Sequence, residues 1–159
     1  MGTAWMFLLS QILVLAAYSL SDSYSTPAAG STQERIIYDF GKGIWPENII
    51  LRHNGNVLGG LLSTPQIFEI DPITHECKIT HTFEDKTGVF GFAETEPDLF
   101  YAVASNFSLG TFEGVEGSAD LYELDFRSLS QDPKIRKVMD FPAAGWFNGL
   151  ATLDGEKGL

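Results

Sequence analysis

Residues 120–125 read Asp-Leu-Tyr-Glu-Leu-Asp, and they repeat, almost residue for residue, the run Gln-Ile-Phe-Glu-Ile-Asp at residues 66–71. Both runs follow one pattern: polar, aliphatic, aromatic, Glu, aliphatic, Asp. Alternation of this kind, with a turn signal such as Asp71-Pro72 at its end, is typical of β-strands. The two runs therefore predict two copies of one β-unit.

Further strands are expected on both sides of each repeated run. Asn54-Gly55 is a strong hairpin signal between the runs 49–52 and 57–58. Strands are also predicted at residues 78–83, 99–104 and 137–141, and residues 90–93 begin the second unit.

Phenylalanine marks the end of each unit. Phe40, Phe83 and Phe141 close matching runs, and they lie 43 and then 58 residues apart. The longer interval holds a Gly-rich insert at residues 106–118, for which we predict a loop.

A third unit begins near the C-terminus. Asn148-Gly149-Leu150 and Asp154-Gly155 echo Asn48-Ile49-Ile50 and Asn54-Gly55 at a constant offset of 100 residues. Short strands recurring at this spacing favour an all-β, partial β-propeller of about two blades plus the first strand of a third. The alternative is a β-sandwich or a meander with accidental similarity. Because a propeller needs at least about four blades to close, we expect the chain to be truncated or to self-associate.

The N-terminus predicts the compartment. An uncharged apolar run at residues 4–20 predicts a signal peptide over residues 1–21, with a membrane anchor as the alternative. A Ser/Thr/Pro-rich disordered leader follows at 22–34, so the propeller part spans 35–159. We expect a secreted or vacuolar glycoprotein, glycosylated at the sequon of Asn106.

The composition limits the classes of partner and of site that the protein can have. A net charge of −11 argues against nucleic-acid and anionic-membrane partners. The single cysteine, Cys77, cannot form an intrachain disulfide. His53, His75 and His81 are scattered and predicted to lie at the surface, and no Ser/His/Asp triad or His-rich metal cluster is evident.

Three motifs resemble a known group of proteins. Residues 45–52 (WPENIILR) with Asn54-Gly55, residues 91–94 (GFAE) and residues 147–150 (FNGL) are similar to fungal secreted six-bladed β-propellers. That group is distantly related to the senescence-marker protein and gluconolactonase superfamily. Within it, the sequence most resembles hetero-Diels-Alderases of fungal tropolone-sesquiterpenoid pathways. The resemblance covers residue 36 to the C-terminus.

The resemblance to the lactonase branch implies a cation at the propeller axis. By position, Glu47 and Asn148 match two of its ligands, and the matching Asp would lie beyond Leu159. Such oxygen ligands suit Ca²⁺ or Mg²⁺, which could polarise a lactone carbonyl. The alternative is that Glu47 and Asn148 satisfy backbone groups in turns.

The first functional hypothesis is a pericyclase that aligns a diene-type intermediate with an alkene. That chemistry relies on an apolar, shaped pocket and on orientation, and it needs no cofactor. The expected partner is a small apolar substrate, and the candidate pocket residues are Trp45, Asn48, Phe90, Phe92, Trp146 and Phe147. For the aromatic ones the alternative is ordinary core packing. The competing functions are a metal-dependent lactone hydrolase and a non-catalytic binding propeller or inactive fragment.

Overall fold

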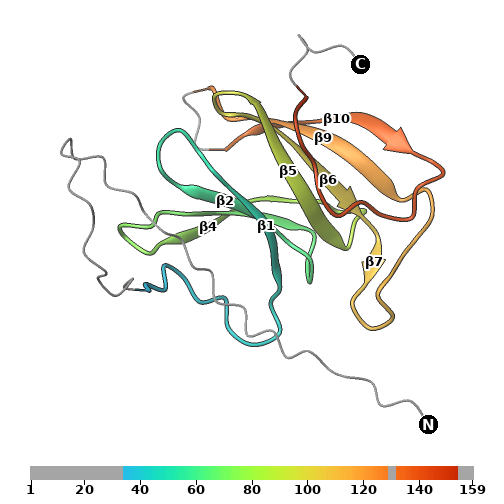
Figure 1. Ribbon diagram of the computed structural model, residues 1–159, viewed down its shortest axis with the longest axis horizontal. Coiled ribbons are helices and arrows are strands. Elements are labelled where there is room, and N and C mark those ends of the chain that lie inside the picture. The colour runs from blue at the N-terminus through green and yellow to red at the C-terminus, as the bar shows by residue number, and fades with distance from the viewer. Residues whose placement is uncertain (1–33, 129–131, 154–159) are drawn as a thin grey trace, which may run out of the picture.

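The structure is a computed structural model that describes residues 34–128 and 132–153 (Figure 1). The predicted signal peptide (1–21) and all but the last residue of the predicted leader (22–34) lie outside the described residues. Within those ranges the chain forms antiparallel sheets and no helix, which confirms the all-β prediction. No helix in the described part is long and apolar enough to cross a membrane.

The first sheet contains four strands in sequence order: β1 (Pro46–Leu51), β2 (Val57–Leu61), β3 (Gln66–Ile70) and β4 (Cys77–Thr82). Each strand pairs antiparallel with the next. The predicted Asn54-Gly55 hairpin is present, with Gly55 at φ 88° and its N–H donating to the Arg52 carbonyl at 2.9 Å. Only a residue without a Cβ adopts this φ without strain, so Gly55 sets the register of β1 on β2.

The second sheet has the same meander. Its strands are β5 (Gly88–Glu96), β6 (Leu99–Ser105), β9 (Ala119–Asp125) and β10 (Lys134–Phe141). Between β6 and β9 the chain forms a small hairpin, β7 (Phe107–Ser108) and β8 (Glu113–Gly114), within the insert predicted to be a loop. The prediction was wrong there because two-residue strands are too short to show alternation.

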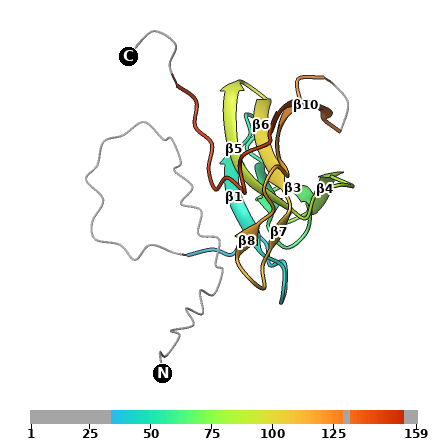
Figure 2. The same cartoon turned by 90° about the vertical axis from the view of Figure 1, so that its right-hand side faces the viewer.

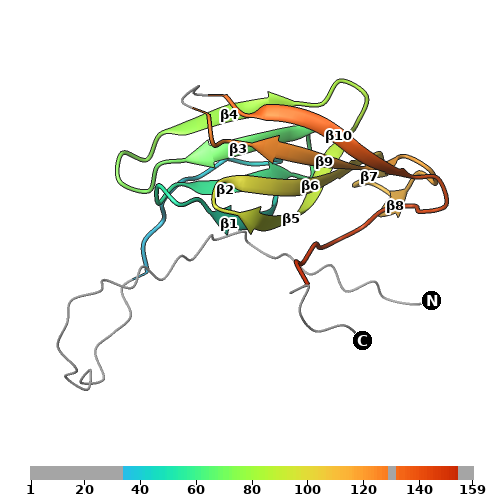
Figure 3. The same ribbon diagram turned by 90° about the horizontal axis from the view of Figure 1, so that it is seen from above.

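The two sheets pack face to face, as the view from above shows (Figure 3). The central core between them is made of aliphatic and aromatic side chains: Leu58, Ile67, Phe83, Val89, Phe92, Phe100, Ala102, Ala104, Tyr122, Leu124 and Phe126. Gly60 allows a close approach, since a Cβ there would lie 2.8 Å from Cγ1 of Val89. β5 therefore packs closely on β1 and β2, and the start of the second sheet is fixed on the first.

Each sheet also has an outer core. That of the first sheet contains Ile37, Val57, Leu61, Phe68 and Ile70, and the N-terminal residues Tyr38 and Phe40 pack against it. That of the second sheet contains Leu62, Phe90, Val103, Phe107 and Ala119, and is covered by Trp45 and the C-terminal segment 141–150. Each sheet is therefore apolar on both faces, unlike a sheet with one solvated side.

Arg52 ties the two sheets together at one end. Its guanidinium contacts Glu69 of β3 at 2.6 Å and Asp98, in the β5–β6 turn, at 3.0 Å. It also lies 4.2 Å from the centre of the Phe126 ring. The side chains of Arg52 and Glu69 are only 10% and 11% exposed, so this is a largely desolvated ion pair.

A second charged cluster surrounds Asp120, whose side chain is only 4% exposed. Lys86 and Lys137 contact its two carboxylate oxygens at 2.7 and 2.9 Å. Burial works against ionisation of Asp120, but the two lysines outweigh that effect and lower its pKa. The Tyr122 hydroxyl also donates to Asp120, at 3.3 Å.

The third unit differs from expectation. Residues 148–153 contain no strand, although the sequence echo of Asn48-Ile49-Ile50 predicts one. The physical reason is pairing: the first strand of a unit gets its hydrogen bonds from the second strand, and no second strand of this unit lies in the described residues. The described sheets do not close into a ring.

Candidate functional site

Aromatic side chains gather at the end of the molecule where both sheets begin. We call Trp45, Phe90, Phe107, Phe112 and Trp146 the entrance cluster. Phe107 is at its centre, with ring centroids 5.7 Å from Phe90, 5.7 Å from Phe112 and 4.9 Å from Trp146. Trp45 lies 6.0 Å from Phe112, so the rings form one continuous wall.

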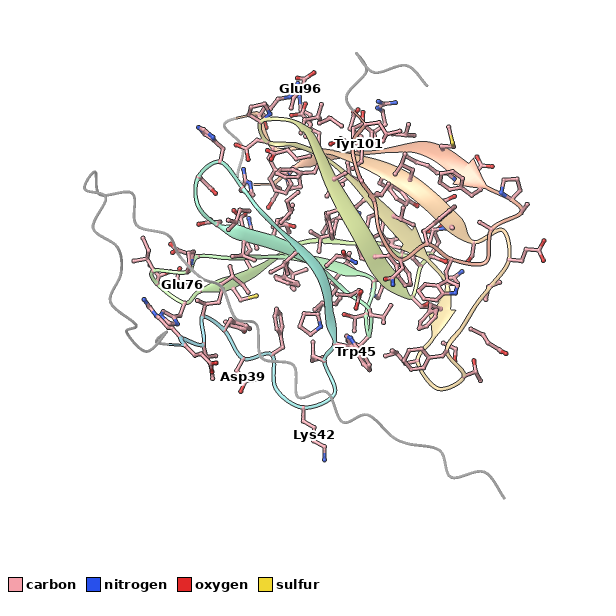
Figure 4. All side chains as sticks on the ribbon, viewed as in Figure 1. Asp39, Lys42, Trp45, Glu76, Glu96 and Tyr101 are labelled. Carbon is pink, nitrogen blue, oxygen red and sulfur yellow. The ribbon has the colours of Figure 1, made fainter. Side chains whose placement is uncertain are left out.

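Backbone hydrogen bonds hold Trp45 at the start of β1. Its N–H donates to the Ser63 hydroxyl at 3.0 Å, and its carbonyl accepts from Leu62 N–H at 2.8 Å. Figure 4 shows Trp45 at the opposite end of the sheets from Glu96 and Tyr101.

The β7–β8 hairpin presents Phe112, whose side chain is 57% exposed. Phe112 has a left-handed φ of 58°, which is unusual for an aromatic residue, and its N–H bonds to the Ser108 carbonyl. Strain of this kind costs about 1–3 kcal/mol and persists only where surrounding structure enforces it. The hairpin stands beside the beginning of β1 (Figure 2).

Gly114 of the hairpin leaves the space into which Trp146 packs. A Cβ on Gly114 would lie 2.7 Å from Cδ1 of Trp146 and 2.5 Å from the Gly145 carbonyl oxygen. Any side chain at Gly114 would therefore push Trp146 away. Trp146 remains 39% exposed, and with Phe112 it gives the entrance cluster a solvent-facing aromatic surface.

Two polar side chains of β1, Glu47 and Asn48, lie next to the entrance cluster. The side-chain amide of Asn48 donates to the main-chain carbonyl of Asn148 at 2.9 Å and to Glu47 at 3.4 Å. Asn48 is the extra residue of a β-bulge, with φ 52°. Burial raises the pKa of Glu47, while a hydrogen bond from the Trp45 side chain partly opposes that rise. A half-buried carboxyl with a raised pKa beside aromatic rings is a common feature of functional sites.

The structure gathers some of the predicted pocket residues and separates others. Trp45, Phe90 and Trp146 meet in the entrance cluster, and Asn48 lies at its polar edge. Phe92 instead lies in the central core, because a bulge between Val89 and Phe92 breaks the alternation of β5. Phe147 lies 4.8 Å from Phe141 and packs on the outer core of the second sheet, which includes Phe90 and Phe107.

Sequence reasoning missed Phe107 and Phe112. Both lie in the insert, which was treated as a loop because of its glycines. The available signal was the presence of two aromatic residues within a short Gly-rich stretch, since loops that carry aromatics often carry binding surfaces.

The predicted cation ligands Glu47 and Asn148 come together through their shared partner Asn48. The described residues contain no group of three or more His, Cys, Asp or Glu side chains that could hold a metal. Ca²⁺ takes about six to eight oxygen ligands, which can include main-chain and amide carbonyls and water, so Glu47 and Asn148 alone would not complete a site. The cation remains a prediction.

The other predicted residues are placed as follows. His53 and His75 are exposed, as expected, whereas His81 is half-buried against Phe83 and its pKa is lowered by burial. Cys77 is free and half-buried, and burial raises its pKa, which disfavours a reactive thiolate. Asn106 is half-buried between β6 and β7, with its backbone held by Ser118 and Val115.

The sequence is similar to those of two known fungal proteins. The chain is 31% identical over 133 residues to the proposed hetero-Diels-Alderase asR5 of Sarocladium schorii, which covers 79% of this chain and 33% of that protein. It is 26% identical over 157 residues to a proposed hetero-Diels-Alderase of a Phoma species, covering 91% of this chain and 44% of that protein. The chain thus spans between a third and just under half the length of these curated relatives. No protein-family model matches the sequence.

Proposed function

We propose that the chain is part of an enzyme that catalyses a hetero-Diels–Alder cycloaddition in fungal secondary metabolism, joining a tropolone quinone methide to a humulene-type alkene. The observation that carries the proposal is the similarity to two distant homologues named hetero-Diels-Alderases. We further propose that its two four-stranded meanders are the first two blades of a six-bladed propeller.

The entrance cluster suits such a reaction. A cycloaddition forms its bonds without an external acid, base or redox group, and its rate rises mainly when the two partners are held close and aligned. Exposed rings such as Phe112 and Trp146 offer flat apolar surface on which an unsaturated substrate can stack.

The polar edge supplies orientation. A hetero-Diels–Alder partner carries an oxygen in the reacting system, and that oxygen accepts hydrogen bonds. The nearby donors are the Glu47 carboxyl, when protonated, and the Asn48 N–H that makes only a long 3.4 Å contact with Glu47. A donor at that oxygen withdraws electron density from the diene and favours attack by an electron-rich alkene.

The test uses the complete enzyme of which we propose this chain is a part, with the quinone methide precursor and the alkene. We expect faster adduct formation and a biased stereochemical ratio relative to buffer. Trp146→Ala and Phe112→Ala should lower the rate, while Ile73→Ser, which removes an exposed apolar side chain far from the cluster, should not. Equal rates and ratios with and without protein would overturn the proposal.

Metal-dependent lactone hydrolysis is the second candidate, because Glu47 and Asn148 converge on Asn48. Lactone hydrolysis that stops on chelation and returns with Ca²⁺ would favour it over cycloaddition. If the chain shows neither activity yet still binds an apolar ligand, it is a binding propeller.

We also propose that the protein enters the secretory pathway and is glycosylated at Asn106. The carbohydrate would attach beside the β7–β8 hairpin. A mass decrease on enzymatic deglycosylation, absent in Asn106→Gln, is the expected result; an unchanged mass would overturn this proposal.

A further inference from the structure

The two sheets have the same arrangement in three dimensions. In each sheet, matched residues point to the matching face. Phe68 of β3 points into the outer core of the first sheet, and Tyr122, its counterpart in β9, points into the central core. Their neighbours point the other way: Ile67 into the central core and Leu121 toward the outer core of the second sheet. In both sheets, the aromatic residue of the repeated run therefore points to the face on the N-terminal side of its sheet.

A matched pair of aromatic contacts supports this order. Phe83 follows β4, and its ring lies 4.4 Å from Tyr122, with His81 packed edge-on against it at 4.5 Å. At the N-terminus, Phe40 lies 4.7 Å from Phe68, with Tyr38 packed edge-on against it at 4.8 Å.

Burial agrees at the first two positions of the matched runs. Ile36 and Ile79, which begin the matched runs, are 62% and 41% exposed, whereas the next residues, Ile37 and Thr80, are 5% and 9% exposed. Residues 36–40 therefore occupy, relative to the first sheet, the position that residues 79–83 occupy relative to the second. Figure 1 shows this N-terminal segment running beneath the first sheet.

One difference separates the two runs. Residues 79–82 belong to β4, which pairs along its length with β3. Residues 36–40 have only an isolated bridge at Ile36, and no ladder between described strands includes them.

We infer that residues 36–40 form the outer strand of a further antiparallel sheet, whose other three strands come from a β-meander beyond the described chain. The strand beside them would carry the pattern of β3 and β9: aliphatic, aromatic, Glu, aliphatic, Asp. This sheet would pack on the first sheet as the first packs on the second.

A second copy of the chain is a poor source of that strand. β3 lies between β2 and β4, and β9 lies between β6 and β10, so both strands of this type are already paired on both edges. The two relatives, in contrast, have more than half of their length outside the matched segment, which is ample for further units. Strand addition at an open edge is a common mode of β-recognition.

The experiment mixes the full chain with the part of the Sarocladium schorii relative that lies outside its matched segment, produced separately and shown to be folded by circular dichroism. We expect a complex in which amide hydrogen exchange at residues 36–40 slows by at least about tenfold. The measurement needs no substrate, so its failure is separate from failure of the proposed activity.

Two matched variants test the backbone pairing. Ile36→Pro/Asp39→Pro removes N–H groups from both edges of the segment at two exposed positions and should abolish the complex. Ile36→Ser/Asp39→Asn changes the same side chains, keeps the N–H groups, and should bind as the parent chain does. No complex, a complex with unchanged exchange at 36–40, or equal binding by both variants would overturn the inference.

Discussion

The side-chain amide of Asn48 donates a hydrogen bond to the main-chain carbonyl of Asn148, 100 residues further along the chain, at 2.9 Å. The two residues hold corresponding positions in the first and third units, and between them the bulge of β5 repeats the bulge of β1. The bond therefore joins the beginnings of two units across the one between them. It fixes the C-terminal segment next to the entrance cluster.

The first prediction concerns Asn48 itself. Ala at this position loses the hydrogen bond and must adopt φ 52°, so we expect unfolding free energy to fall by about 1–2 kcal/mol. Gly adopts that φ freely and should cost about 0.5–1 kcal/mol. Urea denaturation measures both. Equal losses for Ala and Gly would mean that the backbone conformation carries no strain.

The second prediction concerns Gly91. A Cβ there would lie 2.5 Å from the Leu150 nitrogen and 2.6 Å from the Gly149 carbonyl carbon. Gly91→Ala should therefore lift residues 148–150 from β5, cost about 1–3 kcal/mol, and speed amide exchange in that segment. Gly149→Ala is the matched control, because its Cβ would meet nothing within 4 Å. Unchanged exchange in Gly91→Ala would show that the segment is not held there.

How much the sequence alone could predict depended on the length of the repeat. The alternation at 66–71 and 120–125 correctly located β3 and β9, because a six-residue period-2 run has few other readings. The insert hairpin and the bulge near Phe90 escaped prediction, since two-residue strands and single extra residues leave no periodic trace.

Only the part of the candidate site that the repeat marks could be predicted from the sequence. Trp45 and Trp146 lie at unit beginnings, which the repeat marks, and both belong to the entrance cluster, where Phe112 and Phe107 lie between them. Phe92 was misplaced because its facing direction depends on the bulge two residues earlier. Phe112 depends on a left-handed backbone conformation that an aromatic residue does not signal.

The third prediction concerns Arg52. Arg52→Leu leaves Glu69 largely buried without its cation and removes the contact with Phe126, so we expect a loss of about 3–5 kcal/mol. The control is Arg136→Leu, whose ion pair with Glu123 joins a 63% exposed side chain to a 20% exposed one and should matter by less than about 1 kcal/mol. Chemical denaturation of the two variants compares them. Similar losses would mean that the Arg52 pair contributes no more than a surface pair.

The last prediction concerns pH. The pKa of Asp120 is lowered in the folded chain, because the contacts with Lys86 and Lys137 outweigh the burial that would raise it. A carboxyl with a lowered folded pKa contributes stability above its unfolded value, 3.8, and that stability is lost as the pH falls through the folded value. The free energy of unfolding should therefore drop as the pH falls below about 4, and the drop should be shallower in Asp120→Asn.

Asp120→Asn should also be less stable at neutral pH, because Lys86, only 6% exposed, loses its buried counter-ion. Glu76→Gln, which removes an exposed carboxylate between β3 and β4, is the control and should keep the parent slope. The measurement is a series of urea denaturations between pH 7 and pH 2. If Asp120→Asn keeps the full acid dependence, the two lysines do not stabilise the ionised form, and the cluster contributes packing rather than charge.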